Sequence, residues 1–277
     1  NLISLFYLKF FSQGAGYKHV VALRLWDADI GDEGVRAFCQ FMLDTGNTSI
    51  QLVEMMNCGI GVLGCEFISR IFDKERANKI SILTLDYNTF GNEGLQQLME
   101  NLKDSKSLTY LSLAYCNIDQ NGVKYFADYL SATQSLEKLI LQGNPLKNAG
   151  MTQLINIIFD NTSLEEINLN NILFGNSPET MQSLVSLMKN NLTLLAYSLK
   201  FNFITDQGKL KSKLNKFFIF LDFEILLREG LKAEGCKHIY QFLIDEKISK
   251  PLFDEYYKMM KSRKKPKKKG KGGKKKK

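Results

Sequence analysis

The stretch LTLDYNTFGNEG at residues 83–94 decides the fold, because its pattern returns along most of the chain. The pattern has the form L-x-L-x-x-N-x-I-x-x-x-G. Its Asn column falls at positions 28, 58, 88, 116, 144, 172 and 202, so the steps are 30, 30, 28, 28, 28 and 30 residues. Copies in register at this spacing indicate a repeat architecture, in which each unit buries its apolar face against its neighbours.

Each column of the repeat has a physical role. The alternating Leu-x-Leu is typical of a short strand with one buried face. The Asn or Cys column falls where the chain turns, and a side chain there can satisfy buried backbone groups. Cys58 and Cys116 occupy this column, so we interpret them as structural thiols. The glycine leads into a helix with apolar residues at helical spacing, as at Leu95, Leu98 and Leu102.

From about Val20 to Leu243 the pattern resembles the leucine-rich repeat family, and in particular its ribonuclease-inhibitor-like members. The resemblance implies an α/β leucine-rich repeat solenoid, a horseshoe with parallel strands on the concave face and helices on the convex face. It leaves the function open, since this subfamily includes inhibitors, Ran GTPase activators, immune sensors and ciliary complex subunits. The sequence departs from the pattern at Ala28, Ile172 and Pro178.

Four segments are expected. They are an N-terminal lead-in or cap (1–19), the solenoid (20–246), a C-terminal helix (247–262) and a disordered lysine-rich tail (263–277). The solenoid has seven clear repeats and one degenerate copy, in which Ile239, Phe242 and Leu243 are expected on the apolar face of a helix. An atypical terminal repeat caps the open end of a solenoid. The lead-in is apolar but contains Lys9, which favours a core role over a targeting segment.

The charge of the chain is placed unevenly. The 277 residues have a formal net charge of +8, but residues 261–277 alone contribute +12, which leaves −4 for residues 1–260. A run of lysine and glycine cannot bury a core and is suited to contact an acidic polymer. The tail lysines assigned to this contact are Lys264, Lys265, Lys267, Lys268, Lys269, Lys271, Lys274, Lys275, Lys276 and Lys277.

Nucleic acid, acidic protein tails and an anionic membrane are the candidate partners of the tail. The tail has no interleaved aromatic residues to stack on bases, which weighs against specific recognition of RNA or DNA. The sequence has no lipidation motif, and its longest apolar run, residues 217–227, is too short and too charged to span a bilayer. Acidic protein tails, such as those of tubulin, therefore remain as the candidate partners of the lysine-rich tail. A solubilising or nuclear-targeting role is the alternative.

No pattern in the sequence predicts catalysis, a cofactor or a metal. The two histidines, His19 and His238, have no nucleophilic partner in any motif, and no metal-ligand spacing occurs. GIGVLG at residues 59–64 matches GxGxxG, but Gly64 is the glycine of the repeat itself, so no nucleotide is needed to explain it. We therefore expect a protein that is not an enzyme, has no cofactor and takes no small-molecule substrate.

The Ran GTPase activator class is tested by the loops that follow the strands. For that class the resemblance implies a functional arginine on these loops and an acidic C-terminal tail. The loops here contain Lys147 and no arginine, and the tail is basic, so this class is rejected.

The remaining candidate site is the concave strand surface. The first four repeats place Trp, Tyr, Met and aliphatic side chains there, and such residues are enriched at interfaces. The predicted partner-binding residues are Arg24, Trp26, Leu52, Glu54, Met56, Ile82, Asp86, Tyr87, Tyr110 and Tyr115. Four strands form a strip about 15–20 Å long, enough for a helix or an extended peptide. The alternative is that helices or the lead-in fold over part of this face.

The sequence thus predicts a non-enzymatic scaffold in a multi-subunit complex. Its concave face binds protein, and its tail binds an acidic polymer such as axonemal microtubules. A similarity to the leucine-rich-repeat subunit of the nexin–dynein regulatory complex favours a cytoplasmic location in a cilium. Two alternatives stay open. One is a nucleolar or ribosome-associated factor whose tail contacts RNA in the nucleus, and the other is a regulator that inhibits an enzyme.

Overall fold

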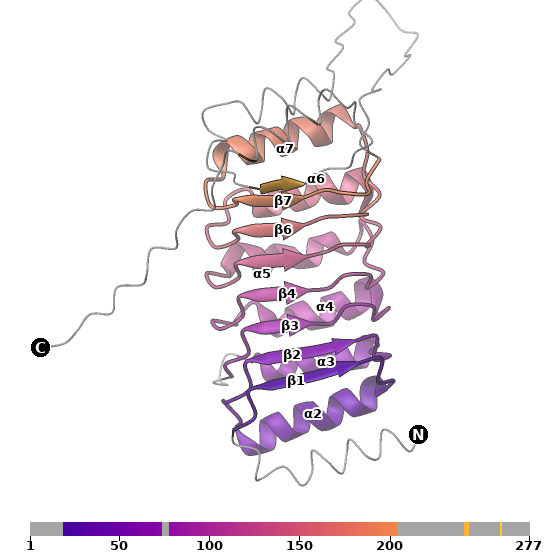
Figure 1. Ribbon diagram of the computed structural model, residues 1–277, viewed down its shortest axis with the longest axis vertical. Helices are drawn as coiled ribbons and strands as arrows, with labels where there is room; N and C mark the ends of the chain where they lie inside the picture. The colour runs from indigo at the N-terminus through magenta and orange to yellow at the C-terminus, as the bar shows by residue number, and fades with distance from the viewer. Residues whose placement is uncertain (1–18, 74–77, 204–240, 244–260, 262–277) are drawn as a thin grey trace, which may run out of the picture.

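The computed structural model describes residues 19–73, 78–203, 241–243 and 261. In these residues, eight parallel strands form one open sheet whose spatial order is the order of the chain (Figure 1). The strands are β1 (Ala22–Trp26), β2 (Leu52–Met56), β3 (Ile82–Thr84), β4 (Tyr110–Ser112), β5 (Lys138–Ile140), β6 (Glu166–Asn168), β7 (Ala196–Ser198) and β8 (Gln241–Leu243). Each strand pairs only with its neighbours in sequence, so the repeats stack as a one-dimensional array.

Helices connect the strands and form a second layer behind the sheet (Figure 1). They are α2 (Gly31–Thr45), α3 (Val62–Ile71), α4 (Gly91–Leu102), the 3₁₀ helix η2 (Val123–Phe126) followed by α5 (Ala127–Ala132), α6 (Lys147–Ile158) and α7 (Pro178–Asn190). The predicted α/β leucine-rich repeat solenoid is confirmed. We call the side of the sheet that faces away from the helices the strand face.

The pairing register follows the predicted repeat frame. Leu23 pairs with Val53, Val53 with Leu83 and Leu83 with Leu111. At the end of the sheet, β8 pairs with β7 and places Phe242 opposite Tyr197. The prediction that Phe242 and Leu243 lie on a helix is therefore wrong, because this segment adds a strand to the unpaired edge of β7.

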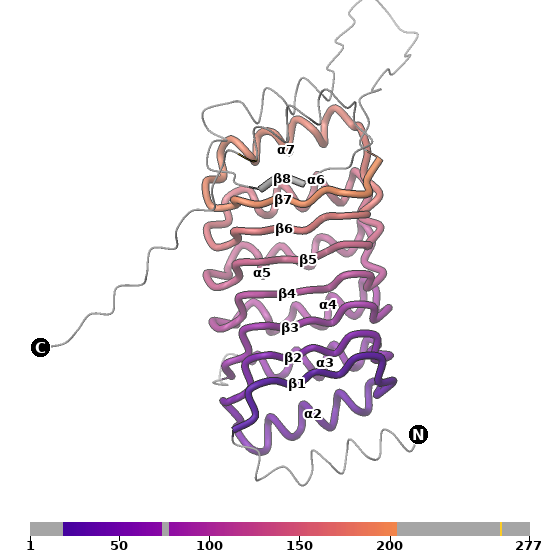
Figure 2. The backbone as a smooth tube through the Cα atoms, in the orientation of Figure 1, coloured from indigo at the N-terminus to yellow at the C-terminus, as the bar shows by residue number. Residues whose placement is uncertain are grey.

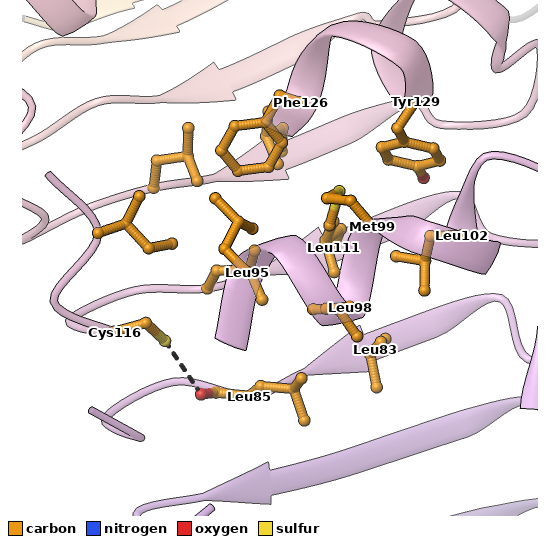
Figure 3. Close-up of a cluster of buried hydrophobic side chains, with 14 of the residues drawn as sticks. Leu83, Leu85, Leu95, Leu98, Met99, Leu102, Leu111, Cys116, Phe126 and Tyr129 are labelled. Carbon is orange, nitrogen blue, oxygen red and sulfur yellow. Dashed lines mark hydrogen bonds between the residues drawn. The ribbon is translucent and has the colours of Figure 1, made fainter. Parts of the chain in front are cut away.

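The core lies between the strand and helix layers. Figure 3 shows Leu83 and Leu111 from two strands packed against Leu95, Leu98 and Leu102 of α4, and all five are at most 1% exposed. Phe126 and Tyr129 of the next repeat complete this cluster, so each core layer is shared by neighbouring repeats.

The glycine column is explained by a close approach between two columns of the repeat. A Cβ atom on Gly94 would lie 2.5 Å from the Cβ of Phe90, and one on Gly34 would lie 2.5 Å from that of Ile30. Contacts this short are forbidden, so the residue four positions after Ile30 and after Phe90 has to lack a side chain.

Buried asparagines connect neighbouring repeats. The side-chain amide of Asn88 donates hydrogen bonds to the carbonyls of Met55 (2.7 Å) and Leu85 (2.9 Å). Its Oδ1 accepts the backbone N–H groups of Cys58 (2.9 Å) and Ile60 (3.1 Å). One side chain thus satisfies four backbone groups of two successive loops, which no water can reach.

Asn144 and Asn202 act in the same way two and four repeats further on, donating to the carbonyls of Leu113 (2.7 Å) and Leu169 (2.9 Å). In the alternate repeats the thiols of Cys58 and Cys116 replace the amide. Cys116 Sγ donates to the carbonyl of Leu85 at 3.2 Å, and burial raises the pKa of both thiols. The interpretation of these cysteines as structural is confirmed.

A second polar column, at the opposite end of the strands, was not predicted. The amide of Asn161 donates to the carbonyl of Leu130 at 2.6 Å, and its Oδ1 accepts the N–H groups of Ser163 (3.0 Å) and Leu164 (2.7 Å). Related side chains bond the turn before the strand at Asn47, Asn78, Ser105, Thr133 and Asn191. The loops of both edges are stacked in columns (Figure 2), and a polar column stabilises each of them.

Several predicted segments lie outside the described residues. They are the lead-in (1–18), the rest of the last repeats (204–240), the helix up to residue 260 and the tail from residue 262. Their boundaries remain predictions. Among the helices that are described, none is long and apolar enough to cross a membrane.

Replacing Asn144 by Ala is expected to lower the free energy of unfolding by about 2–4 kcal/mol, because two carbonyls and two amides lose their buried partners. Urea unfolding followed by circular dichroism measures the change. The control is Asn156→Ala on the exposed side of α6, expected to stay within about 0.5 kcal/mol of the unmodified chain. Equal losses in the two variants would contradict the role of the asparagine ladder.

Candidate protein-binding face

The strand face displays the predicted site residues, but to different degrees. Trp26 is 60% exposed and Tyr87 is 50% exposed. Arg24 is exposed, whereas the remaining predicted residues are half-buried. These half-buried residues are Leu52, Glu54, Met56, Ile82, Asp86, Tyr110 and Tyr115. Strands lie only about 4.8 Å apart, so neighbouring side chains cover one another and the exposed apolar strip is narrower than expected.

Glu54 organises the N-terminal part of the face. Its Oε2 accepts a hydrogen bond from Arg24 Nε at 3.1 Å and another from the indole N–H of Trp26 at 3.2 Å. The Glu54 side chain is only 19% exposed, so solvent competes weakly for these bonds. The exposed indole is therefore oriented by a carboxylate of the next strand.

Asp86 is a half-buried carboxylate two residues after the end of β3. Its Oδ1 accepts the hydroxyl of Ser112 at 2.6 Å and the N–H of Ala114 at 2.8 Å. Burial raises the pKa of the Asp86 carboxyl above its usual range, and the carboxylate of Glu54 adds to the rise. No cation forms an ion pair with Asp86 in the part of the chain that the structure describes.

Asn170 occupies the column of Asp86 three repeats later and makes the same contacts. Its Oδ1 accepts the hydroxyl of Ser198 and the N–H of Lys200, both at 2.7 Å. An uncharged amide therefore suffices for the structural role. We therefore expect the fold not to require the negative charge of Asp86, which leaves the charge available for a function.

Tyr87 and Tyr115 form a stacked pair at the carboxyl ends of β3 and β4. Their ring centroids are 4.7 Å apart and their planes differ by 7°. The next residue in this column is Gly143, where a Cβ would lie 2.3 Å from the Tyr115 ring. The ring of Tyr115 thus lies between Tyr87 and a position that has to stay without a side chain.

Both tyrosines have left-handed backbone conformations, with φ of 61° at Tyr87 and 56° at Tyr115. The whole column shares this conformation: Asp27, Asn57, Gly143, Asn171 and Phe201 also have positive φ. Gly, Asn and Asp tolerate it, whereas a bulky side chain there is a true outlier. Residues held against their backbone preference cluster at functional sites, so the tyrosines indicate a binding surface.

We call Trp26, Glu54, Asp86, Tyr87 and Tyr115 the aromatic–acidic patch. Its members lie on neighbouring repeats, because Trp26 bonds Glu54, Glu54 is the strand partner of Thr84, and Asp86 lies between Thr84 and the stacked tyrosines. Trp and Tyr side chains dominate binding energies at protein interfaces. At the far end of the described repeats Phe201, which shares the column of Tyr87 and Tyr115, is also exposed, and the exposed Leu173 and Phe203 were not predicted from the sequence.

The glycine-rich stretch at residues 59–64 is already occupied by a carboxylate. The N–H of Gly61 donates to Oδ1 of Asp32 at 2.7 Å, and a Cβ on Gly64 would lie 2.6 Å from the same atom. A pyrophosphate placed on this amide would meet a negative charge, which disfavours a nucleotide site. Within the described residues, no group of three or more His, Cys, Asp or Glu side chains is arranged to hold a metal ion.

Comparisons with known proteins agree with this fold. A family model described as Leucine Rich repeat matches residues 18–39 and 104–127. NACHT, LRR and PYD domains-containing protein 14 of Mus musculus is 26% identical over 196 residues, which is 70% of this chain and 19% of that protein. The ribonuclease inhibitor of Mus musculus is 26% identical over 159 residues, or 57% of this chain and 34% of the inhibitor.

Among solved structures, actin-binding site 2 of leiomodin-1 matches with a TM-score of 0.42 and 18% identity, covering 61% of this chain and 86% of that one. The chain spans 19% and 34% of the lengths of the two mouse relatives. Together with the parallel sheet, the sequence matches support a leucine-rich repeat protein.

Replacing Gly143 by Ala is expected to lower the free energy of unfolding by about 2–3 kcal/mol. It should also displace the Tyr115 ring from its stack on Tyr87. Urea unfolding gives the cost, and near-ultraviolet circular dichroism reports the tyrosine pair. The control is Gly46→Ala, which has a φ of 57° but nothing within 4 Å of the added Cβ. In this control the free energy of unfolding should fall by only about 1 kcal/mol, because alanine is disfavoured in the left-handed conformation. An intact tyrosine signal in Gly143→Ala would contradict the geometry of the stack.

Replacing Asp86 by Asn is expected to raise the free energy of unfolding at pH 7 by up to about 1 kcal/mol, allowing for the solvent that still reaches this side chain. The gain should shrink as the pH falls through the raised pKa of Asp86, because the folded chain then protonates the carboxylate before the unfolded chain does. Urea unfolding between pH 7 and pH 4 tests this, with the exposed Asp104→Asn as control. Destabilisation at pH 7 would mean that the fold requires the charge.

Proposed function

We propose that this leucine-rich repeat protein is a non-enzymatic scaffold whose strand face binds a protein partner through the aromatic–acidic patch. Leucine-rich repeat proteins generally act in protein–protein interaction. The observation that supports the proposal most strongly is the stacked pair of Tyr87 and Tyr115 in left-handed conformations. Four other repeats have Asp27, Asn57, Gly143 and Asn171 in this column, and one has the aromatic Phe201. The turn therefore does not require a bulky side chain, and we ascribe the two tyrosines to binding.

The shape and chemistry of the face suit an elongated partner segment. The four strands that contribute the patch form a strip about 15 Å across, wide enough for one helix or one extended peptide. Half-buried Met56 lies opposite the exposed Trp26, and half-buried Leu52 and Ile82 lie at the amino ends of β2 and β3. An aromatic anchor surrounded by polar groups is the usual composition of a binding hot spot.

The lysine-rich tail is proposed as a second attachment, to an acidic polymer. The support is the charge of +12 in residues 261–277, set against −4 in the remainder of the chain. Because no aromatic side chain is interleaved with these lysines, the proposal favours acidic protein tails, such as those of tubulin in a cytoplasmic or axonemal assembly. RNA phosphates in the nucleus are the alternative ligand.

An inhibitor that blocks an enzyme with its strand face is a second candidate. The similarity to a mouse protein named ribonuclease inhibitor favours it, over 57% of this chain. An inhibitor needs only the patch, whereas a scaffold on an acidic polymer also needs the tail.

Affinity capture from a native lysate, with the full chain as bait, tests the patch. The double variant Trp26→Ala/Tyr87→Ala is expected to lose the captured proteins by about tenfold or more, since aromatic anchors dominate interface energies. The matched control is Leu63→Ala/Leu192→Ala, which removes side chains that are 57% and 66% exposed but lie outside the strands. Equal capture by both variants would contradict the proposed site.

A third bait, with the ten tail lysines from Lys264 to Lys277 replaced by Gln, separates the two attachments. Under the scaffold proposal it retains the proteins that depend on the patch but loses the acidic polymer. Material that is rich in RNA and disappears with the tail lysines would favour the nuclear alternative. An enzyme that is captured and inhibited without the tail lysines would favour the inhibitor.

A further inference from the structure

We infer that the lysine-rich tail of this same chain docks on the aromatic–acidic patch, so that the tail and the protein partner compete for one surface. The inference rests on the proposed function, because it takes the patch to be a binding face and the tail to be a ligand of acidic groups. Beyond the proposed function, the inference identifies a basic segment as a ligand of the patch and describes how that segment regulates partner binding.

The N-terminal half of the strand face is negatively charged. Its strands and the loops that follow them hold Asp27, Asp29, Glu54 and Asp86 against the single cation Arg24, which is paired with Glu54. The other half has no excess of negative charge, because Lys138 pairs with Glu166 at 3.2 Å and Lys200 near the end of β7 adds a positive charge. A polycation is therefore attracted to the end of the face that contains the patch.

One lysine side chain, that of Lys138, is already bound on the strand face. The ammonium of Lys138 lies 5.6 Å from the ring centroid of Tyr110 while it forms its ion pair with Glu166. This combination of an aromatic face and a carboxylate is favourable for an ammonium group.

The aromatic–acidic patch has the same combination of aromatic rings and carboxylates, and no described lysine lies over its rings. Asp86 lies next to Tyr87, whose ring is exposed and stacked on Tyr115, and the indole of Trp26 is exposed beside Glu54. In the part of the chain that the structure describes, no cation lies over the rings of Trp26, Tyr87 or Tyr115. Two to four lysines of one extended segment could fill these positions, spaced by glycine.

The tail can reach the patch from the last strand of the sheet. Leu243 ends β8, and Lys264 follows 21 residues later. With the predicted helix over residues 247–262, which would be about 24 Å long, and the other residues extended, this segment reaches about 40 Å. The five strand spacings from β8 to β3 amount to about 24 Å. A tether of this kind keeps the tail at an effective concentration of about millimolar near the face, so even weak contacts populate the docked state.

Docking couples the two attachments of the scaffold. An acidic polymer that binds the tail removes it from the patch and frees the strand face for the protein partner. Away from the polymer, the tail covers the exposed Trp26 and Tyr87. Partner binding is then strongest where the polymer is present, a positive linkage between two ligands of one chain.

The fluorescence of Trp26 tests the inference directly, because it is the single tryptophan of the chain. Quenching by neutral acrylamide is measured on the full chain at about 20 mM and about 500 mM salt, where screening weakens tail contacts. At low salt the quenching constant of the unmodified chain should be about half that of the variant with ten tail lysines replaced by Gln. At high salt the two constants should agree. Polyglutamate at low salt should release the protection.

A matched pair of single substitutions locates the docking site. Asp86→Asn should remove at least half of the salt-dependent protection, and it leaves the contacts of Trp26 unchanged. Glu93→Gln on α4 removes one exposed charge from the helix layer and should leave the protection intact.

Identical quenching of the unmodified chain and the tail variant at low salt would overturn the inference. Protection that increases with protein concentration would also overturn it, because the occupant would then be the tail of a second copy. If docking fails but Trp26→Ala/Tyr87→Ala still loses the captured partner, the proposed function of the patch stands without this regulation. If both fail, the patch is not a binding face.

Discussion

The hydrogen bonds of the buried asparagines are the constraint on which the strand-to-helix loops depend. Asn88 and Asn144 each satisfy backbone groups in two successive repeats, so every loop has to follow the same path. That path gives the residue before each asparagine a left-handed conformation. The same bonds therefore bring Tyr87 and Tyr115, one repeat apart, into a parallel stack at 4.7 Å. The geometry of the proposed binding face is a consequence of the ladder that stabilises the solenoid.

Stability and function conflict at a few positions of this face. Tyr87 and Tyr115 occupy backbone conformations that Asn or Gly would adopt at lower cost. Asp86 retains a charge where Asn170 performs the same structural role without one. A solenoid distributes its stability over many similar interfaces, so it tolerates local costs of about 1 kcal/mol each. Departures from the best local choice are expected at functional sites.

The repeat period predicted the sheet order, the register and the structural role of Cys58 and Cys116, because these follow from a pattern seven times repeated. Exposure could not be predicted, since the covering of Tyr110 or Met56 depends on side chains of adjacent strands. The polar column containing Asn161 was recoverable from its spacing, but Asn, Ser and Thr alternate in it. The strand at Phe242 has no Leu-x-Leu signature, and its pairing with β7 is a tertiary effect.

The proposed function requires that a protein partner contacts the strand face at Tyr87. A photoreactive benzoylphenylalanine placed at position 87 in the full chain, and irradiated in native extract, tests this contact without removing a side chain from the core. The control position is Leu63, which is 57% exposed on α3 in the helix layer. The account predicts a discrete cross-linked partner from position 87 and none from position 63. The same partner from position 63, with nothing from position 87, would contradict it.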